Sequence, residues 1–205
     1  MISRRQTAIV NRVLLLAPLL VFGIAGSWFL ALFLDPGNRG PIHDNLVPEL
    51  IGFCLEGFFL IGLFSLIQRR QDRERREELW QSLRGALREL LSYLDIGLLS
   101  EAAEPADSLA LEQDPAIVQQ LRQKLADQEL DLDAMSTIKS VASRNLATIH
   151  DLIPVAAQLS AAHMRWWLAI SDSVRMITEA KDKESVKYSL NHFLANLGEF
   201  DSQDI

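Results

Sequence analysis

The N-terminal part of the chain contains two long apolar runs, whereas the rest places apolar residues three or four positions apart. The first run, residues 13–34, contains no charged residue, and the second, residues 50–67, contains only Glu56. As helices they would reach roughly 33 and 27 Å, against a hydrocarbon core of about 30 Å. The pattern therefore predicts two transmembrane helices. The first run is longer than the apolar core of a signal peptide, which favours a retained anchor over a cleaved signal.

Arginine positions predict how this pair lies in the membrane, because short basic flanks stay on the cytoplasmic side. Residues 1–12 are basic, whereas the connecting loop, residues 35–49, contains Arg39 as its only arginine or lysine. Several proline and glycine residues in this loop favour a helical hairpin. A second basic cluster follows the hairpin and suits anionic lipid headgroups: Arg69, Arg70, Arg73, Arg75 and Arg76. We therefore expect a multi-pass membrane protein with both termini in the cytoplasm.

Glu56 is the residue most expected to be functional, because an ionised carboxylate inside a bilayer costs several kcal/mol unless it is paired, protonated or facing water. Counted from the loop, Ser27 lies at a similar depth and its hydroxyl could bond Glu56. Gly23, Ser27 and Ala31 are spaced by four, as in closely packed membrane helices, and Gly52 lies one turn from Glu56. The sequence predicts that the Glu56 face packs against Ser27 or against neighbouring copies in a homo-oligomer. A neutral carboxyl in a static contact is the alternative.

The remaining sequence predicts helices that form a cytoplasmic bundle. Residues 68–98 continue the second membrane helix, residues 99–114 form a loop with at most one short helical turn, and residues 115–205 form a helical domain. The apolar row of the continuing helix is Trp80, Leu83, Leu87, Leu90 and Leu94. The predicted fold class is thus all-α, a transmembrane two-helix hairpin followed by a cytoplasmic helical bundle.

Capping and breaking residues predict where the helices of residues 115–205 begin and end. Asp114 followed by Pro115 is a typical helix start, Asp133 can cap the next helix, Pro154 interrupts or restarts the chain, and Gly198 is placed to end the last helix. The expected inward rows are Ile117, Leu121 and Leu125; Met135, Ile138, Val141 or Ala142 and Ile149; Leu159, Ala162 or His163, Trp166, Ile170, Val174 and Ile177; and Val186, Leu190, Phe193 or Leu194 and Leu197.

Charge and residue chemistry exclude several classes of function. Residues 71–205 carry 14 basic and 23 acidic residues, a net charge of −9 that disfavours direct nucleic-acid binding. A single cysteine, Cys54, excludes an intramolecular disulfide and a multi-cysteine zinc site. The nucleotide-binding, metalloprotease and serine-hydrolase motifs are missing, and the histidines are far apart. We therefore predict no catalytic, metal or cofactor site and no enzyme activity.

Two functions fit these features. In the first, copies associate through the hairpin and disrupt the bilayer or form a pore, under control of the cytoplasmic bundle. In the second, the hairpin anchors a bundle that recruits a soluble cytoplasmic partner and has no catalytic activity. A dedicated transporter or channel is less favoured, since two helices alone cannot enclose a pathway, although oligomers could.

In layout, the chain resembles two-transmembrane-helix effector proteins of bacterial anti-phage systems, including the retron-type effectors. The features that carry the resemblance are a short basic N-terminus, the hairpin of residues 13–67, and a helical tail that starts QRRQDRERREELW. The resemblance extends over the whole chain and rests on no signature motif. It implies abortive infection through damage to the inner membrane, restrained by a companion protein or nucleoprotein.

Overall fold

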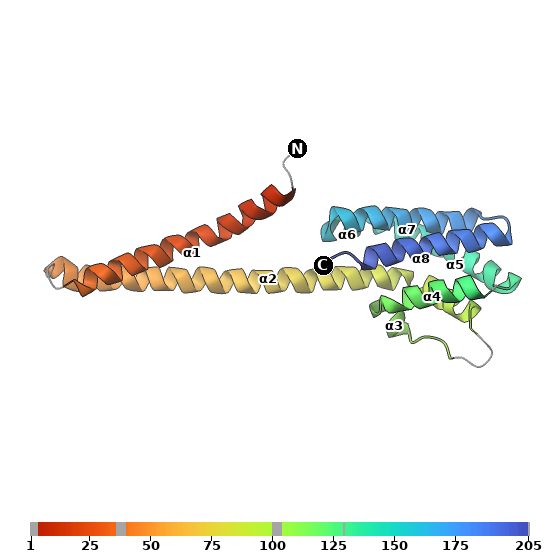
Figure 1. Ribbon diagram of the computed structural model, residues 1–205, viewed down its shortest axis with the longest axis horizontal. Helices are drawn as coiled ribbons and strands as arrows, with labels where there is room; N and C mark the ends of the chain where they lie inside the picture. Colours follow the sequence, from red (N-terminus) through yellow and green to blue (C-terminus); the bar gives the residue numbers. More distant parts are fainter. Residues whose placement is uncertain (1–3, 36–39, 100–103, 129, 205) are drawn as a thin grey trace. The chain divides into compact units, whose positions relative to one another are not determined.

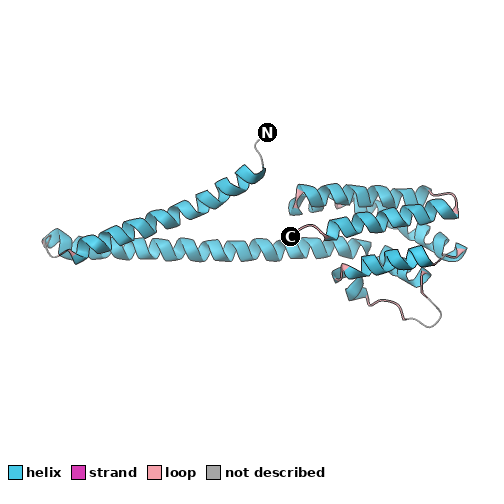
Figure 2. Ribbon diagram, viewed as in Figure 1, coloured by secondary structure: helices cyan, strands magenta, loops and turns pink. Residues whose placement is uncertain are grey.

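The structure, a computed structural model, describes residues 4–35, 40–99, 104–128 and 130–204; the side chains of 4–16 and 41–44 lie outside the description. Every regular element in these ranges is an α-helix, which confirms the predicted all-α class (Figures 1 and 2). The helices are α1 (Arg4–Leu34), α2 (Pro41–Gly97), α3 (Ser108–Gln113), α4 (Ala116–Asp127), α5 (Leu132–Asp151), α6 (Ile153–Leu159), α7 (Ala161–Glu179) and α8 (Lys183–Asp201).

The chain divides into two compact units, an N-terminal unit (Met1–Asp72) and a C-terminal unit (Arg73–Ile205), and each is described by itself. Helix α2 contributes residues to both units.

The predicted loop 35–49 is wrong in its second half, because α2 begins at Pro41; residues 36–39 lie outside the described ranges. Proline fits the first helical position, where no helical N–H bond is lost, and Pro48 removes only one backbone bond from a long helix.

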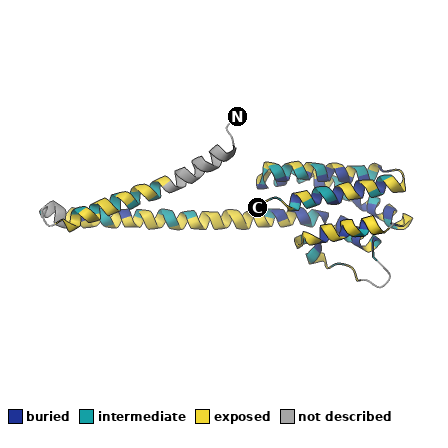
Figure 3. Ribbon diagram, in the orientation of Figure 1, coloured by how far each residue is buried: buried dark blue, intermediate teal, exposed yellow. Residues whose placement is uncertain are grey.

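Helix α7 is the centre of the C-terminal unit, since it packs against α5, α6 and α8, and α8 also packs against α4. The predicted apolar row of α2 is buried in this unit, from Trp80 to the fully buried Leu94. Figure 3 shows buried positions along each long helix of this unit. Side-chain bonds attach α2 to its neighbours: Arg88 binds Glu112 at 2.8 Å, and Asp95 binds Lys124 at 2.9 Å. The C-terminal unit therefore has a buried apolar core to which α2 contributes.

Two helix boundaries agree with the sequence prediction. The carboxylate of Asp114 accepts a hydrogen bond from the Ala116 N–H at 2.8 Å at the start of α4. Pro154 stands in the first turn of α6, directly after the end of α5. The predicted loop 99–114 contains one short helix, α3, while residues 100–103 lie outside the described ranges.

Two other boundaries differ from the prediction. The cap of α5 is Asp131 and not Asp133, because Asp131 has the extended backbone that lets its carboxylate reach the Ala134 N–H, at 2.6 Å. Gly198 does not end the last helix, which continues to Asp201. The continuation buries the Phe200 ring completely, and this apolar burial outweighs the preference of glycine for a helix end.

The apolar stripe predicted over residues 159–177 also needs correction. Ser160 separates α6 from α7 and caps α7 through its hydroxyl, which accepts from the N–H groups of Ala162 and His163. Trp167 is fully buried, whereas Trp166 is only half-buried. Both tryptophans fit a spacing of three or four, but only the Trp167 indole gains a buried acceptor, the Ile149 carbonyl at 2.8 Å.

Candidate functional site

In the N-terminal unit, α1 packs against the first part of α2 through two glycines. A Cβ added to Gly26 would lie 3.3 Å from the Cβ of Cys54, and one added to Gly57 would lie 2.6 Å from the Phe22 ring. The Phe22 and Phe53 rings pack at 5.8 Å between centroids. Gly26 and Gly57 therefore allow the backbones to approach, as small residues do between membrane helices.

The predicted row of small residues, Gly23, Ser27 and Ala31, lies beside this contact and is not its centre. A Cβ on Gly23 would reach the Phe58 ring at 3.7 Å, while Ser27 and Ala31 are exposed. The Ser27 hydroxyl donates to the Gly23 carbonyl of its own helix at 2.8 Å. Packing of this row against neighbouring copies stays a prediction.

Glu56 lies on the side of α2 that faces away from α1. It follows Cys54 by two residues, and successive helix residues point about 100° apart, so its side chain points about 200° from the residue that packs on α1. Glu56 is exposed, and within the described residues it forms no hydrogen bond or ion pair. The predicted bond to Ser27 therefore does not form, and Gly52, whose added Cβ would meet nothing within 4 Å, contacts no α1 side chain either.

Both α1 and α2 are long and apolar enough to cross a membrane, by length and composition. Large apolar side chains remain exposed on them, among them Leu20, Val21, Ile24, Phe59, Phe64 and Leu66. A protein surface in water seldom carries such a continuous apolar cover. The two helices are thus the part of the chain that is suited to a non-aqueous surrounding.

The predicted basic cluster of α2 is exposed along its whole length. Arg73 pairs with Glu77 at 3.0 Å, one turn further on, and Arg75 donates to the side chain of Gln158 at 3.1 Å. These surface contacts contribute little to stability. The arginine side chains are nevertheless exposed at the surface.

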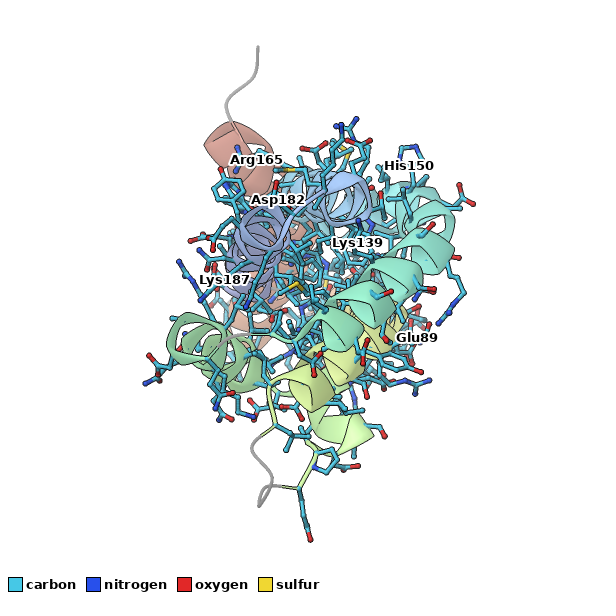
Figure 4. The ribbon with its side chains drawn as sticks, turned by 90° about the vertical axis from the view of Figure 1, so that its right-hand side faces the viewer. Glu89, Lys139, His150, Arg165, Asp182 and Lys187 are labelled. Carbon is cyan, nitrogen blue, oxygen red and sulfur yellow. The ribbon has the colours of Figure 1, made fainter. Side chains whose placement is uncertain are left out.

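The labelled polar side chains of the C-terminal unit come from several of its helices (Figure 4). Its described residues contain no group of three metal-ligating side chains. The labelled side chains of Glu89, His150, Arg165 and Lys187 are spread around the unit (Figure 4). His163 is buried, and desolvation together with the nearby Arg76 charge lowers its pKa. Its Nδ1 lies 2.8 Å from the hydroxyl of the α7 cap, an arrangement that fixes the helix start.

An open groove of about 660 Å³ runs between the antiparallel helices α5 and α7. Its floor includes Leu146 and Leu168, and the latter is 44% exposed. His150 and Asp151, adjacent in sequence, both line it, and Asp172 stands on the α7 side. The groove is thus mainly apolar with a polar rim, a shape that suits a helix or peptide of a partner.

The most unusual polar contact is a buried ion pair that the sequence did not reveal. Arg84 in α2 lies 3.3 Å from Asp201 at the end of α8, and their side chains are 0% and 3% exposed. The same guanidinium donates to the carbonyls of Glu112 and Asp114. Burial raises the pKa of Asp201 to about 6, which the positive charge of Arg84 only partly opposes. Arg84 therefore ties α2 to the α3–α4 junction and to the C-terminal end of α8.

No protein-family model, curated protein or solved structure matches this chain.

Proposed function

We propose that the protein is an integral protein of the bacterial inner membrane whose α1 and α2 form a transmembrane hairpin. Support comes from two apolar helices of spanning length, with backbones in close contact at Gly26 and Gly57. The arginine-rich flanks support a cytoplasmic position for both termini and for the C-terminal unit. The cluster Arg69–Arg76 then lies at the inner leaflet, where anionic headgroups attract it.

We further propose that copies of this hairpin associate and disrupt the bilayer or form a pore. The observation that carries this function is the position of Glu56, on the face of α2 opposite α1 and without a hydrogen-bond or ion-pair partner among the residues that the structure describes. A carboxyl on that face would meet hydrocarbon unless another protein surface or water covers it, and acids in membrane helices usually face protein or a water-filled cavity. A second copy would supply the protein surface, and water could be enclosed between the two copies.

The C-terminal unit, in this proposal, controls the hairpin. Helix α2 belongs to both units, so a partner that binds the acidic bundle acts on the same helix that carries Glu56. The resemblance in layout to retron-type and related anti-phage effectors supports a role in abortive infection, with a cytoplasmic protein or nucleoprotein as the restraint. This part of the proposal rests on analogy of layout.

Controlled expression in bacteria tests the effector function. Growth and a potential-sensitive dye should report depolarisation by the wild type and a marked loss of it for Glu56→Leu. Glu49→Leu is the matched control, since Glu49 lies seven residues earlier, on nearly the same face of α2, but outside the apolar run. Equal depolarisation by all three proteins would exclude a role for Glu56, and a fully polarised membrane with wild-type protein present would exclude the effector function.

The groove between α5 and α7 favours a second candidate, a membrane anchor that recruits a soluble protein. Its exposed Leu168 offers an apolar contact that the chain itself leaves open. Co-purification from membranes discriminates the two functions. An anchor retains a stoichiometric partner that Leu168→Glu releases, and it leaves the membrane potential unchanged; Glu56→Leu then has no effect on partner binding.

A further inference from the structure

The two hydroxyl groups nearest to Glu56 in the described apolar segments are already bonded to their own helices. Ser27 donates to the Gly23 carbonyl at 2.8 Å, and Ser65 donates to the Ile61 carbonyl at 2.7 Å. Neither is directed to the Glu56 carboxyl, which points away from α1. Neither of these hydroxyl groups in the described segments therefore shares a hydrogen bond with the carboxyl.

Copies in one membrane place equivalent residues at equal depth, because they share the same topology. When symmetric copies meet through the outward face of α2, the group that Glu56 meets is the Glu56 of the next copy. The Gly52 Cβ position, one turn away on this face, is open to at least 4 Å, so no side chain of the hairpin covers the approach. A ring of equivalent carboxyls is the result.

We propose that the Glu56 carboxyls of several copies line a shared aqueous path that passes small monovalent cations in preference to anions. Carboxylates at close range repel one another, and this repulsion is relieved by water, by a bound cation or by protonation of some members. Rings of acidic side chains give cation selectivity in channels for the same reason. The inference rests on the proposed membrane effector and specifies what such an effector conducts.

The first arm of the test examines whether α2 meets α2 between copies. In a Cys54→Ser background, Gly52→Cys should form a disulfide-linked dimer in native membranes under mild oxidation. Leu30→Cys on α1 serves as the control for random collision, since Leu30 is also exposed. A Gly52→Cys signal no stronger than the Leu30→Cys signal overturns the shared path.

The second arm measures selectivity with purified full-length protein in liposomes that hold a KCl gradient. The wild type should prefer K⁺ to Cl⁻ by about tenfold, which corresponds to about 1.4 kcal/mol. Glu56→Gln keeps the shape of the side chain and removes the charge, and it should reduce this preference to near unity. Glu49→Gln should leave the preference as in the wild type.

The outcomes separate the inference from the function on which it rests. A wild-type leak without ion preference, or a preference that Glu56→Gln retains, overturns the cation path but leaves membrane disruption standing. Liposomes that the wild type does not permeabilise overturn both. Glu56→Gln vesicles that lose all permeability while Gly52→Cys cross-linking persists show that the carboxyl is needed for conduction and support the path.

Discussion

The buried pair Arg84–Asp201 leads to a prediction against the usual expectation for a broken ion pair. The two side chains lie 3.3 Å apart and are shielded from solvent, yet Arg84 Nη1 and both Asp201 carboxylate oxygens form no hydrogen bond within the described residues. Burial raises the pKa of Asp201 from 3.8 to about 6 despite the nearby cation. The loss of hydration therefore exceeds the attraction that replaces it.

The free energy involved follows from this difference in pKa. A rise from 3.8 to about 6 corresponds to roughly 3 kcal/mol, at 1.36 kcal/mol for each unit, by which the fold favours the neutral carboxyl. Because the folded pKa is raised, the stabilising contribution of Asp201 is complete below about pH 3.8 and is lost as the pH rises through about 6. At neutral pH Asp201 is ionised, and the folded protein is less stable by this free energy than it would be with a neutral side chain there.

Asp201→Asn should therefore increase the free energy of unfolding of the C-terminal unit at pH 7.5, by up to about 3 kcal/mol. The amide removes the charge and keeps an oxygen that can accept from Arg84. Urea titration of the full-length protein in detergent, followed by tryptophan fluorescence, measures the change, because Trp167 is buried in this unit. The advantage of the variant over the wild type should shrink below pH 6 and disappear near pH 4. Comparing two proteins at each pH cancels the contribution of His163.

Two controls make this reasoning refutable. Asp204→Asn, the same change at an exposed position, should alter stability by less than about 0.5 kcal/mol. Arg84→Met should destabilise by roughly 3–5 kcal/mol, because it leaves a buried carboxylate without its cation. A variant Asp201→Asn that is less stable than the wild type at pH 7.5, or a difference that does not depend on pH, would refute the assignment of burial as the dominant effect.

Two further predictions concern packing within each unit. Gly57→Ala places a Cβ only 2.6 Å from the Phe22 ring, so it should push the two apolar helices apart and increase maleimide labelling of the buried Cys54. Gly52→Ala, whose Cβ meets open space, should leave the labelling unchanged. Equal labelling of the two variants would contradict the packing of α1 on α2. Phe200→Ala should reduce the free energy of unfolding by about 3–5 kcal/mol because it empties a buried site, whereas Tyr188→Ala, 58% exposed, should cost far less; similar losses in urea titration would place Phe200 outside the core.

Apolar periodicity was sufficient to predict the all-α class and the buried row of α2. The row of Leu83, Leu87, Leu90 and Leu94 is buried as expected, since an apolar stripe at helical spacing packs against the core of a protein. Helix ends were less predictable, because they depend on contacts distant in sequence. Gly198 is a residue type that commonly ends a helix. The helix nevertheless continues, because the Phe200 ring packs in the core against Trp167, with 5.6 Å between the ring centroids.

The candidate site was predictable only in part. The charge of Glu56 inside an apolar run identified the residue, but its direction depends on which face of α2 receives α1. That face is set by Gly26 and Gly57, whose close contacts emerge only when the two helices are paired. Arg84 was missed for a related reason: it stands beside a leucine row, and its partner Asp201 lies more than 100 residues away in sequence.

Asp201 and Glu56 obey the same physical rule and differ in where the compensation lies. Asp201 loses hydration in the folded chain, and Glu56 loses it under the proposed membrane location; each then needs a counter-charge, a proton or trapped water. Asp201 obtains its counter-charge within the chain from Arg84, and its raised pKa measures how incomplete the compensation is. Glu56 obtains none from the described residues, since it lies on the side of α2 that faces away from α1. Under the proposed membrane location, its compensation must come from outside the chain, and the geometry that denies it an internal partner is what makes association of copies the favoured solution.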